Sequence, residues 1–190
     1  MKISTLIAFS SALFHVLLLS QYSQARPRTK IVITRSFSSS DTSKLNASFD
    51  AWKTFPPCSG SPKYSVHLFL VFSRSLNTSS EVVSIIKNIG SLSEATNGWG
   101  DCIAKVIGIG SDIDRSLDIY NPEETRTNPL WVNRPDRKFQ RSVHAIQRSA
   151  DGPYNFMFTM GIDLVPIKRY WLDLLIDEIE NSESDFVKFR

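Results

Sequence analysis

The sequence has few of the residues that build thiol or metal chemistry. It contains two cysteines and three histidines in 190 residues, and Cys58 and Cys102 do not form a Cys-x-x-Cys pair. A metal site made from these two cysteines is therefore not expected. The sequence shows no Cys or Ser nucleophile, in a recognisable motif, that would be a catalytic partner for His67 or His144. Both histidines are therefore interpreted as structural. In an oxidising compartment an even pair of cysteines favours a disulfide, and we expect a Cys58–Cys102 bridge.

The chain also lacks a strong excess of one charge. Its 22 Lys and Arg against 19 Asp and Glu give a formal net charge of +3, spread along the chain. Binding of nucleic acid needs a concentrated basic surface, so nucleic acid is excluded as a partner. One local basic cluster is present, and it fits either the solvated start of a helix or an anion site. Its members are Arg134, Arg137, Lys138 and Arg141.

The N-terminal segment is short for a transmembrane helix. Its apolar run, Ile3 to Leu19, is interrupted by polar residues, whereas a span needs about 20 apolar residues. Met1-Lys2 supplies a positive start, and Ser23-Gln24-Ala25 ends in the small residues that a signal peptidase reads. We expect residues 1–25 to be a cleaved signal peptide or a retained membrane anchor. Either form directs the chain into the secretory pathway, with membrane contact only through this segment.

Two glycosylation sequons agree with export. Asn46-Ala-Ser48 and Asn77-Thr-Ser79 are both acceptor patterns for N-linked glycans. Such patterns matter only in a chain that reaches the lumen. Asn46 and Asn77 are therefore predicted glycosylation sites.

The remaining chain has the length of one domain preceded by a linker. Residues 26–63 are rich in Ser, Thr and Pro, which predicts a stem. Within it, Phe49, Trp52 and Phe55 are spaced three apart and predict one short amphipathic turn that docks on the domain. Residues 64–190 are expected to hold the α/β domain.

Apolar runs of strand length alternate with helical patterns in this domain. The predicted strands are Val66–Phe72, Cys102–Ile109 and Tyr154–Met160, and the predicted helices begin near Ser79, Pro135 and Tyr170. A β-α-β-α-β-α order predicts a mostly parallel sheet with helices on both faces. Such sheets bind ligands beyond the carboxyl ends of their strands, so the loops after the strands should hold the site.

Carboxylates in these loops are candidate metal ligands. Asp163 follows the third strand, and Asp112 and Asp114 after the second strand are weaker candidates. Two carboxylates two residues apart can share a hard divalent cation that also takes phosphate oxygens. The alternative for Asp163 is a structural Asp that ends the strand and caps the next turn.

Several ordered blocks between residues 50 and 180 carry a family resemblance. They are Trp52-Lys-Thr-Phe-Pro-Pro-Cys58, Leu70-Val-Phe-Ser73, Asp118-Ile-Tyr120, Asn128-Pro-Leu-Trp-Val-Asn133 with Pro135, Arg137 and Phe139, and Tyr154-Asn-Phe-Met-Phe-Thr-Met160 through Asp163, Pro166 and Trp171-Leu-Asp173. Together they resemble secretory-pathway glycosyltransferase-like proteins of algae and other protists. The resemblance implies a GT-A-like, Rossmann-like half that binds a nucleotide sugar, with the acceptor half largely missing.

The resemblance also implies roles for particular residues. Asp163 matches the acidic position that holds Mg²⁺ or Mn²⁺ against the donor diphosphate, and Asn133 and Arg137 match positions beside that diphosphate. Two positions depart from the pattern, because Gly161 stands where Glu or Asp is expected and Arg134 stands where Gly is expected. Losing one carboxylate weakens a metal site.

Three functions remain open from the sequence. The first is a metal-dependent glycosyltransferase that moves a sugar from a nucleotide-sugar donor to a hydroxyl of a glycan or protein acceptor, in the Golgi or outside the cell. The second is an inactive or truncated binding protein of the same fold. The third is an unrelated secreted α/β binding module.

Overall fold

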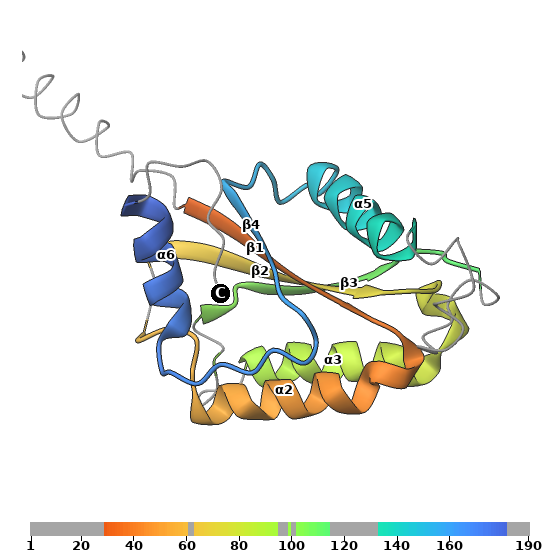
Figure 1. Ribbon diagram of the computed structural model, residues 1–190, viewed down its shortest axis with the longest axis horizontal. Helices are drawn as coiled ribbons and strands as arrows, with labels where there is room; N and C mark the ends of the chain where they lie inside the picture. The colour runs from red at the N-terminus through yellow and green to blue at the C-terminus, as the bar shows by residue number, and fades with distance from the viewer. Residues whose placement is uncertain (1–28, 61–62, 95–98, 100–101, 115–132, 182–190) are drawn as a thin grey trace, which may run out of the picture.

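The computed structural model describes residues 29–60, 63–94, 99, 102–114 and 133–181 (Figure 1). The elements are β1 (Thr29–Phe37), η1 (Ser39–Asp41), α2 (Thr42–Thr54), β2 (Tyr64–Phe72), η2 (Leu76–Thr78), α3 (Ser80–Glu94), β3 (Lys105–Gly110), α5 (Asn133–Gln147), β4 (Phe156–Thr159) and α6 (Trp171–Asn181). The predicted signal peptide or anchor lies outside these residues. Among the described helices, none has the length and apolar character to cross a membrane.

The described strands form one parallel sheet in the order β3-β2-β1-β4. Helices α2 and α3 cover one face, and α5 covers the other (Figure 1). The predicted α/β class, with a parallel sheet and helices on both faces, is confirmed. The chain moves outward from β1 to β2 and β3, and α5 then carries it back to β4 on the other side of β1. Strand order therefore reverses at β1, where doubly wound sheets bind ligands at the carboxyl edge.

The prediction of a stem over residues 26–63 is wrong for residues 29–54, which form the inner strand β1 followed by η1 and α2. Every residue of β1 pairs with β2, from Thr29 opposite Tyr64 to Phe37 opposite Phe72. The Ser/Thr bias was misleading because Thr, Ile and Val favour strands and Ser favours helix starts. The predicted docking is confirmed for Phe49 and Trp52, which are buried on α2, whereas Phe55 is half-buried just after that helix. The predicted short turn is a helix of 13 residues.

Two apolar clusters hold the layers together. The larger one lies between the sheet and helices α2 and α3, and it also includes buried residues of α6. Its centre is aromatic: Trp52 contacts Phe49, Trp99 and Trp171 at ring-centroid distances of 4.8, 5.1 and 5.3 Å. The smaller cluster lies under α5 and consists of Val32, Phe69, Val71 and Ile146.

The predicted disulfide is confirmed and belongs to the larger cluster. Cys58 and Cys102 are bridged across 44 residues of sequence, with their Cα atoms 5.7 Å apart. Both residues are buried. The bridge ties the segment after α2 to the residues just before β3.

A chain beginning at residue 63 is expected to lose cooperative unfolding. It would lack β1, which pairs with both β2 and β4, and α2, which carries half of the aromatic centre. Near-ultraviolet circular dichroism during heating would measure this, with a chain beginning at residue 26 as the reference.

The double variant Cys58→Ser, Cys102→Ser of the longer chain separates the fold from the disulfide. It should stay folded and lose about 2–4 kcal/mol of unfolding free energy, as expected for a bridge over a loop of this length. A cooperative transition at the reference midpoint in the shorter chain would show that β1 is dispensable.

Candidate functional site

A cleft of about 410 Å³ opens between the carboxyl end of β3 and α5. It is lined by Ser111, Asp112, Ile113, Gln140, Arg141, His144 and Arg148. Residues 141, 144 and 148 recur at helical spacing, so they project from one side of α5 and its last turn. The cleft lies at the carboxyl edge of the parallel sheet, where such sheets bind ligands, but beyond β3 and not at the reversal of strand order at β1.

The cleft carries more positive than negative charge. Arg141 and Arg148 are exposed, and within the described residues neither is paired with a carboxylate. His144 lies between them and is also exposed. Among the described residues of the lining, Asp112 is the one carboxylate. Because guanidinium groups present a planar fork of donors that matches phosphate oxygens, the lining favours a phosphate-bearing ligand.

The loop after β3 brings a buried hydroxyl to the cleft. The backbone N–H groups of Ser111 and Ile113 donate to the carbonyls of Phe72 and Ser73, at 2.8 and 2.9 Å, so the loop extends the β3–β2 pairing. Asp112, between them, has a φ of 51° in the left-handed region. Ser111 is 2% exposed, and its Oγ has no hydrogen-bond partner in the described part of the chain. Such a hydroxyl costs about 1–3 kcal/mol, which a hydrogen bond to a ligand would offset once the Ser111 side chain turns toward the cleft.

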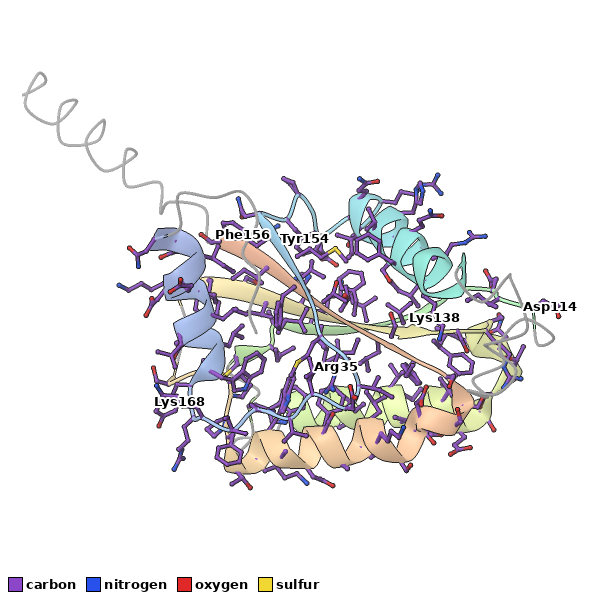
Figure 2. All side chains as sticks on the ribbon, viewed as in Figure 1. Arg35, Asp114, Lys138, Tyr154, Phe156 and Lys168 are labelled. Carbon is purple, nitrogen blue, oxygen red and sulfur yellow. A yellow bond between two sulfur atoms is a disulfide. The ribbon has the colours of Figure 1, made fainter. Side chains whose placement is uncertain are left out.

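The structure brings some of the predicted site residues together and separates others. Asp112 is in the cleft, whereas Asp114 is exposed and points away from the sheet (Figure 2). Asn133 and Arg137 lie in the first turns of α5, but their side chains lie outside the described part. Asp163 is not among the lining residues of the cleft. Among the described residues, no group of three or more His, Cys, Asp or Glu could hold a metal ion.

The basic cluster seen in the sequence has two kinds of member. Lys138 is 4% exposed and lies between α5 and the sheet, whereas Arg141 lines the cleft (Figure 2). His144, interpreted from the sequence as structural, is instead exposed in the cleft. A lone histidine gives no sign of its partners in sequence. The helical spacing of Arg141, His144 and Arg148 was the signal that could have found this side of α5.

His67, by contrast, is structural. It is buried in β2, and its Nδ1 lies 2.8 Å from the hydroxyl of Tyr154. Burial lowers the pKa of His67 below its usual value, and the charge of Asp151 partly opposes that shift. Lys105 pairs with Asp151 at 2.5 Å, so this group fastens the loop before β4 to the amino ends of the strands.

The two sequon asparagines are exposed in different settings. Asn46 lies on α2, and Asn77 lies in η2. In the Asn46 sequon the third residue is not accessible: Ser48 is 1% exposed, and its Oγ donates to the carbonyl of Leu45 at 2.9 Å. Asn77 thus has the more open surroundings in the folded domain.

Comparisons of the chain with protein-family models, with curated proteins and with solved structures find no match. The α/β class is established by the sheet itself. The GT-A-like assignment and the glycosyltransferase-like resemblance remain predictions from the sequence.

Proposed function

We propose that this chain is a glycosyltransferase-like protein that binds the diphosphate of a nucleotide-sugar donor in the cleft between β3 and α5. The observation that carries the proposal is the joint presence of Arg141, Arg148 and the unpartnered Ser111 hydroxyl in one cleft at the carboxyl edge of a parallel sheet. Two guanidinium groups and a hydroxyl supply the donors that a diphosphate requires.

The rest of the lining favours a ligand with hydroxyl groups as well as phosphate. The Asp112 carboxylate would repel a bare anion but can accept hydrogen bonds from ribose or sugar hydroxyls. Gln140 offers both a donor and an acceptor. A cleft of about 410 Å³ also lies within the usual range for small-molecule sites. A nucleotide sugar meets these requirements better than inorganic phosphate does.

In the proposed reaction the bond between the anomeric carbon of the donor and its diphosphate breaks, and a bond to an acceptor hydroxyl oxygen forms. The acceptor hydroxyl loses its proton to solvent or to the departing diphosphate. Arg141 and Arg148 would stabilise the negative charge that grows on the departing diphosphate. Mg²⁺ or Mn²⁺ remains a prediction of the resemblance. A cation beside Asp112 would take most of its ligands from phosphate oxygens and water.

The second candidate function is a binding protein of the same fold that does not transfer sugar. Gly161 removes one carboxylate from the expected acidic pair, and this departure favours that alternative. Both candidates bind the nucleotide, and turnover separates them. The disulfide supports a secretory location for either, because such bridges persist in oxidising compartments.

Binding of UDP and GDP to a chain beginning at residue 26 tests the proposal. We expect at least one of them to raise the unfolding midpoint, and isothermal titration calorimetry with and without Mn²⁺ should give its affinity. Arg148→Gln should weaken that affinity by roughly tenfold to a hundredfold, since a hydrogen bond to a charged group contributes about 1.5–3 kcal/mol. Arg169→Gln, which removes an exposed arginine outside the cleft, is the matched control. If neither nucleotide stabilises the parent chain, the proposal fails.

Ser111→Ala should change stability and binding in opposite directions. Removing a buried hydroxyl that has no partner should leave the free energy of unfolding unchanged or raise it, whereas the affinity for the nucleotide should fall about threefold to tenfold. Ser142→Ala is the matched control, because this buried hydroxyl donates to the carbonyl of Lys138 at 2.7 Å and does not line the cleft. The control should lose about 1 kcal/mol of stability and keep its affinity.

Equal nucleotide affinity in Ser111→Ala and in the parent chain would remove Ser111 from the site. Chemical denaturation measures the stability of both variants, and calorimetry measures their affinity.

A further inference from the structure

Residues 164–174, the apolar segment, run from the loop after β4 into the first turn of α6 and expose several large apolar side chains. These side chains are Leu164, Val165, Ile167, Tyr170 and Leu174. Ile167 is 89% exposed, and each of the others is between 40% and 52% exposed. Within the described residues only two further large apolar side chains are exposed. Single exposed apolar residues are ordinary, whereas a group of them marks an interaction site.

The backbone of the apolar segment is fixed, so the fold itself exposes these side chains. Just before the segment, Nη2 of Arg35 donates to the carbonyl of Gly161 at 2.8 Å. Pro166 is buried in its middle. The N–H of Tyr170 donates to the carbonyl of Pro56 at 2.7 Å, and Tyr170 has a φ of 60° in the left-handed region. A segment that is already ordered loses little conformational entropy when a partner covers it.

The charges within the segment are mostly of one sign. Residues 164–172 contain Lys168 and Arg169 and no Asp or Glu. Both basic side chains are exposed, and neither forms a salt bridge within the described residues. Lys168 extends away from the domain (Figure 2). Asp163 and Asp173 lie on either side of this stretch, and the Asp173 carboxylate already accepts two hydrogen bonds within the fold. Positive charge therefore accompanies the exposed apolar side chains.

This combination fits the surface of an anionic bilayer. Ile167 protrudes with most of its surface in solvent, as does a side chain that enters the boundary between headgroups and acyl chains. Tyr170 has an apolar ring and a polar tip, which suit the headgroup level, and the Arg169 guanidinium lies 5.8 Å from its ring centroid. The apolar stems of Lys and Arg lie along such a surface while their charges bind lipid phosphates.

A second copy of the chain is a less suitable partner for this segment. A twofold-symmetric contact brings the same surface of both copies together, so Lys168 and Arg169 would lie close to their own counterparts. Like charges placed together in this way oppose association. An anionic bilayer attracts the same residues. The charge of the segment therefore favours lipid over self-association.

We propose that the apolar segment is a membrane-binding site, in which Ile167 and its apolar neighbours enter an anionic bilayer while Lys168 and Arg169 bind its phosphate groups. This contact is separate from the one expected of the N-terminal segment. The apolar segment lies on the α2 side of the sheet (Figure 1), so the cleft between β3 and α5 stays open on the opposite face. The proposal does not depend on what that cleft binds.

Co-sedimentation with lipid vesicles tests the apolar part of the site. The chain from residue 26 lacks the N-terminal apolar run and should still bind vesicles of phosphatidylcholine and phosphatidylserine in equal parts. Ile167→Ser should weaken this binding at least about tenfold, because a large aliphatic side chain no longer leaves water. Phe139→Ser, which removes an exposed apolar side chain on α5, is the matched control and should bind as the parent does.

The same assay tests the basic part of the site. The double variant Lys168→Gln, Arg169→Gln should bind these vesicles roughly tenfold to thirtyfold more weakly, since each basic residue near an anionic surface adds to the affinity. The matched control is Lys44→Gln, Lys87→Gln, which removes the same charge from exposed positions on α2 and α3 and should keep most of the affinity. Vesicles of phosphatidylcholine alone should bind the parent chain as weakly as the anionic vesicles bind the double variant.

Insertion is measured by fluorescence with lipids that carry bromine on their acyl chains. The tryptophan of Ile167→Trp should be quenched when the vesicles are anionic, whereas that of Phe139→Trp should not be. The signal of the parent chain provides the background from its own tryptophans. Equal quenching in the two variants would contradict insertion through the apolar segment.

Two further results would overturn the proposal. One is a folded parent chain, as judged by near-ultraviolet circular dichroism, that does not bind anionic vesicles. The other is equal vesicle binding by Ile167→Ser and the parent. A parent dimer that Ile167→Ser converts to a monomer in sedimentation equilibrium, without vesicle binding, would assign the segment to self-association instead. UDP titration of the same samples is independent, because its failure would end the nucleotide-sugar proposal and leave the vesicle result unchanged.

Discussion

The parallel pairing of β1 on both of its edges is the interaction on which the rest of the domain depends. β1 pairs with β2 along its whole length and with β4 through Ile31 to Thr34. Its alternate residues supply both cores, since Ile31 and Ile33 lie in the larger cluster and Val32 lies in the smaller one. The same alternation sends Arg35 toward α2. The chain moves from β1 toward β3 and then returns past β1 to β4. Because crossovers between parallel strands are right-handed, this reversal places α5 and the cleft on the face opposite to α2.

The sequence is sufficient for the α/β class but not for this central strand. Long apolar runs identify β2 and β3. For β2 the reason is burial on both faces, which makes a strand apolar at nearly every position. β1 has only three consecutive apolar residues, Ile31 to Ile33, followed by Thr34 and Arg35. A charged residue in a central strand argues against burial unless its partners are known. Those partners, Ser48 and the loop after β4, are distant in sequence or belong to the segment interpreted as a stem.

The candidate site was predictable in part for a similar reason. The rule that ligands bind at the carboxyl edge selects the loop after β3, and Asp112 in that loop lines the cleft. The basic residues of α5 lie beside that loop only because the connection from β3 to β4 passes back over the sheet. Residues that come from two elements carry no joint pattern in sequence. The missing partner of the Ser111 hydroxyl is likewise a property of packing, because nothing in the sequence shows which hydroxyls are satisfied.

Positively charged side chains occur on both faces of the sheet, but they are buried on one face and exposed on the other. On the α2 face the charge of Arg35 is buried among backbone carbonyls and aromatic rings, so little of it acts on a ligand. On the α5 face Arg141 and Arg148 are exposed in a cleft, and their charge acts on whatever enters it. Gly161, whose carbonyl accepts a hydrogen bond from Arg35, belongs to the α2 side of the sheet and does not line the cleft. In the proposed function a diphosphate in the cleft takes its positive charge and directional donors from guanidinium groups, so that binding does not depend on residue 161.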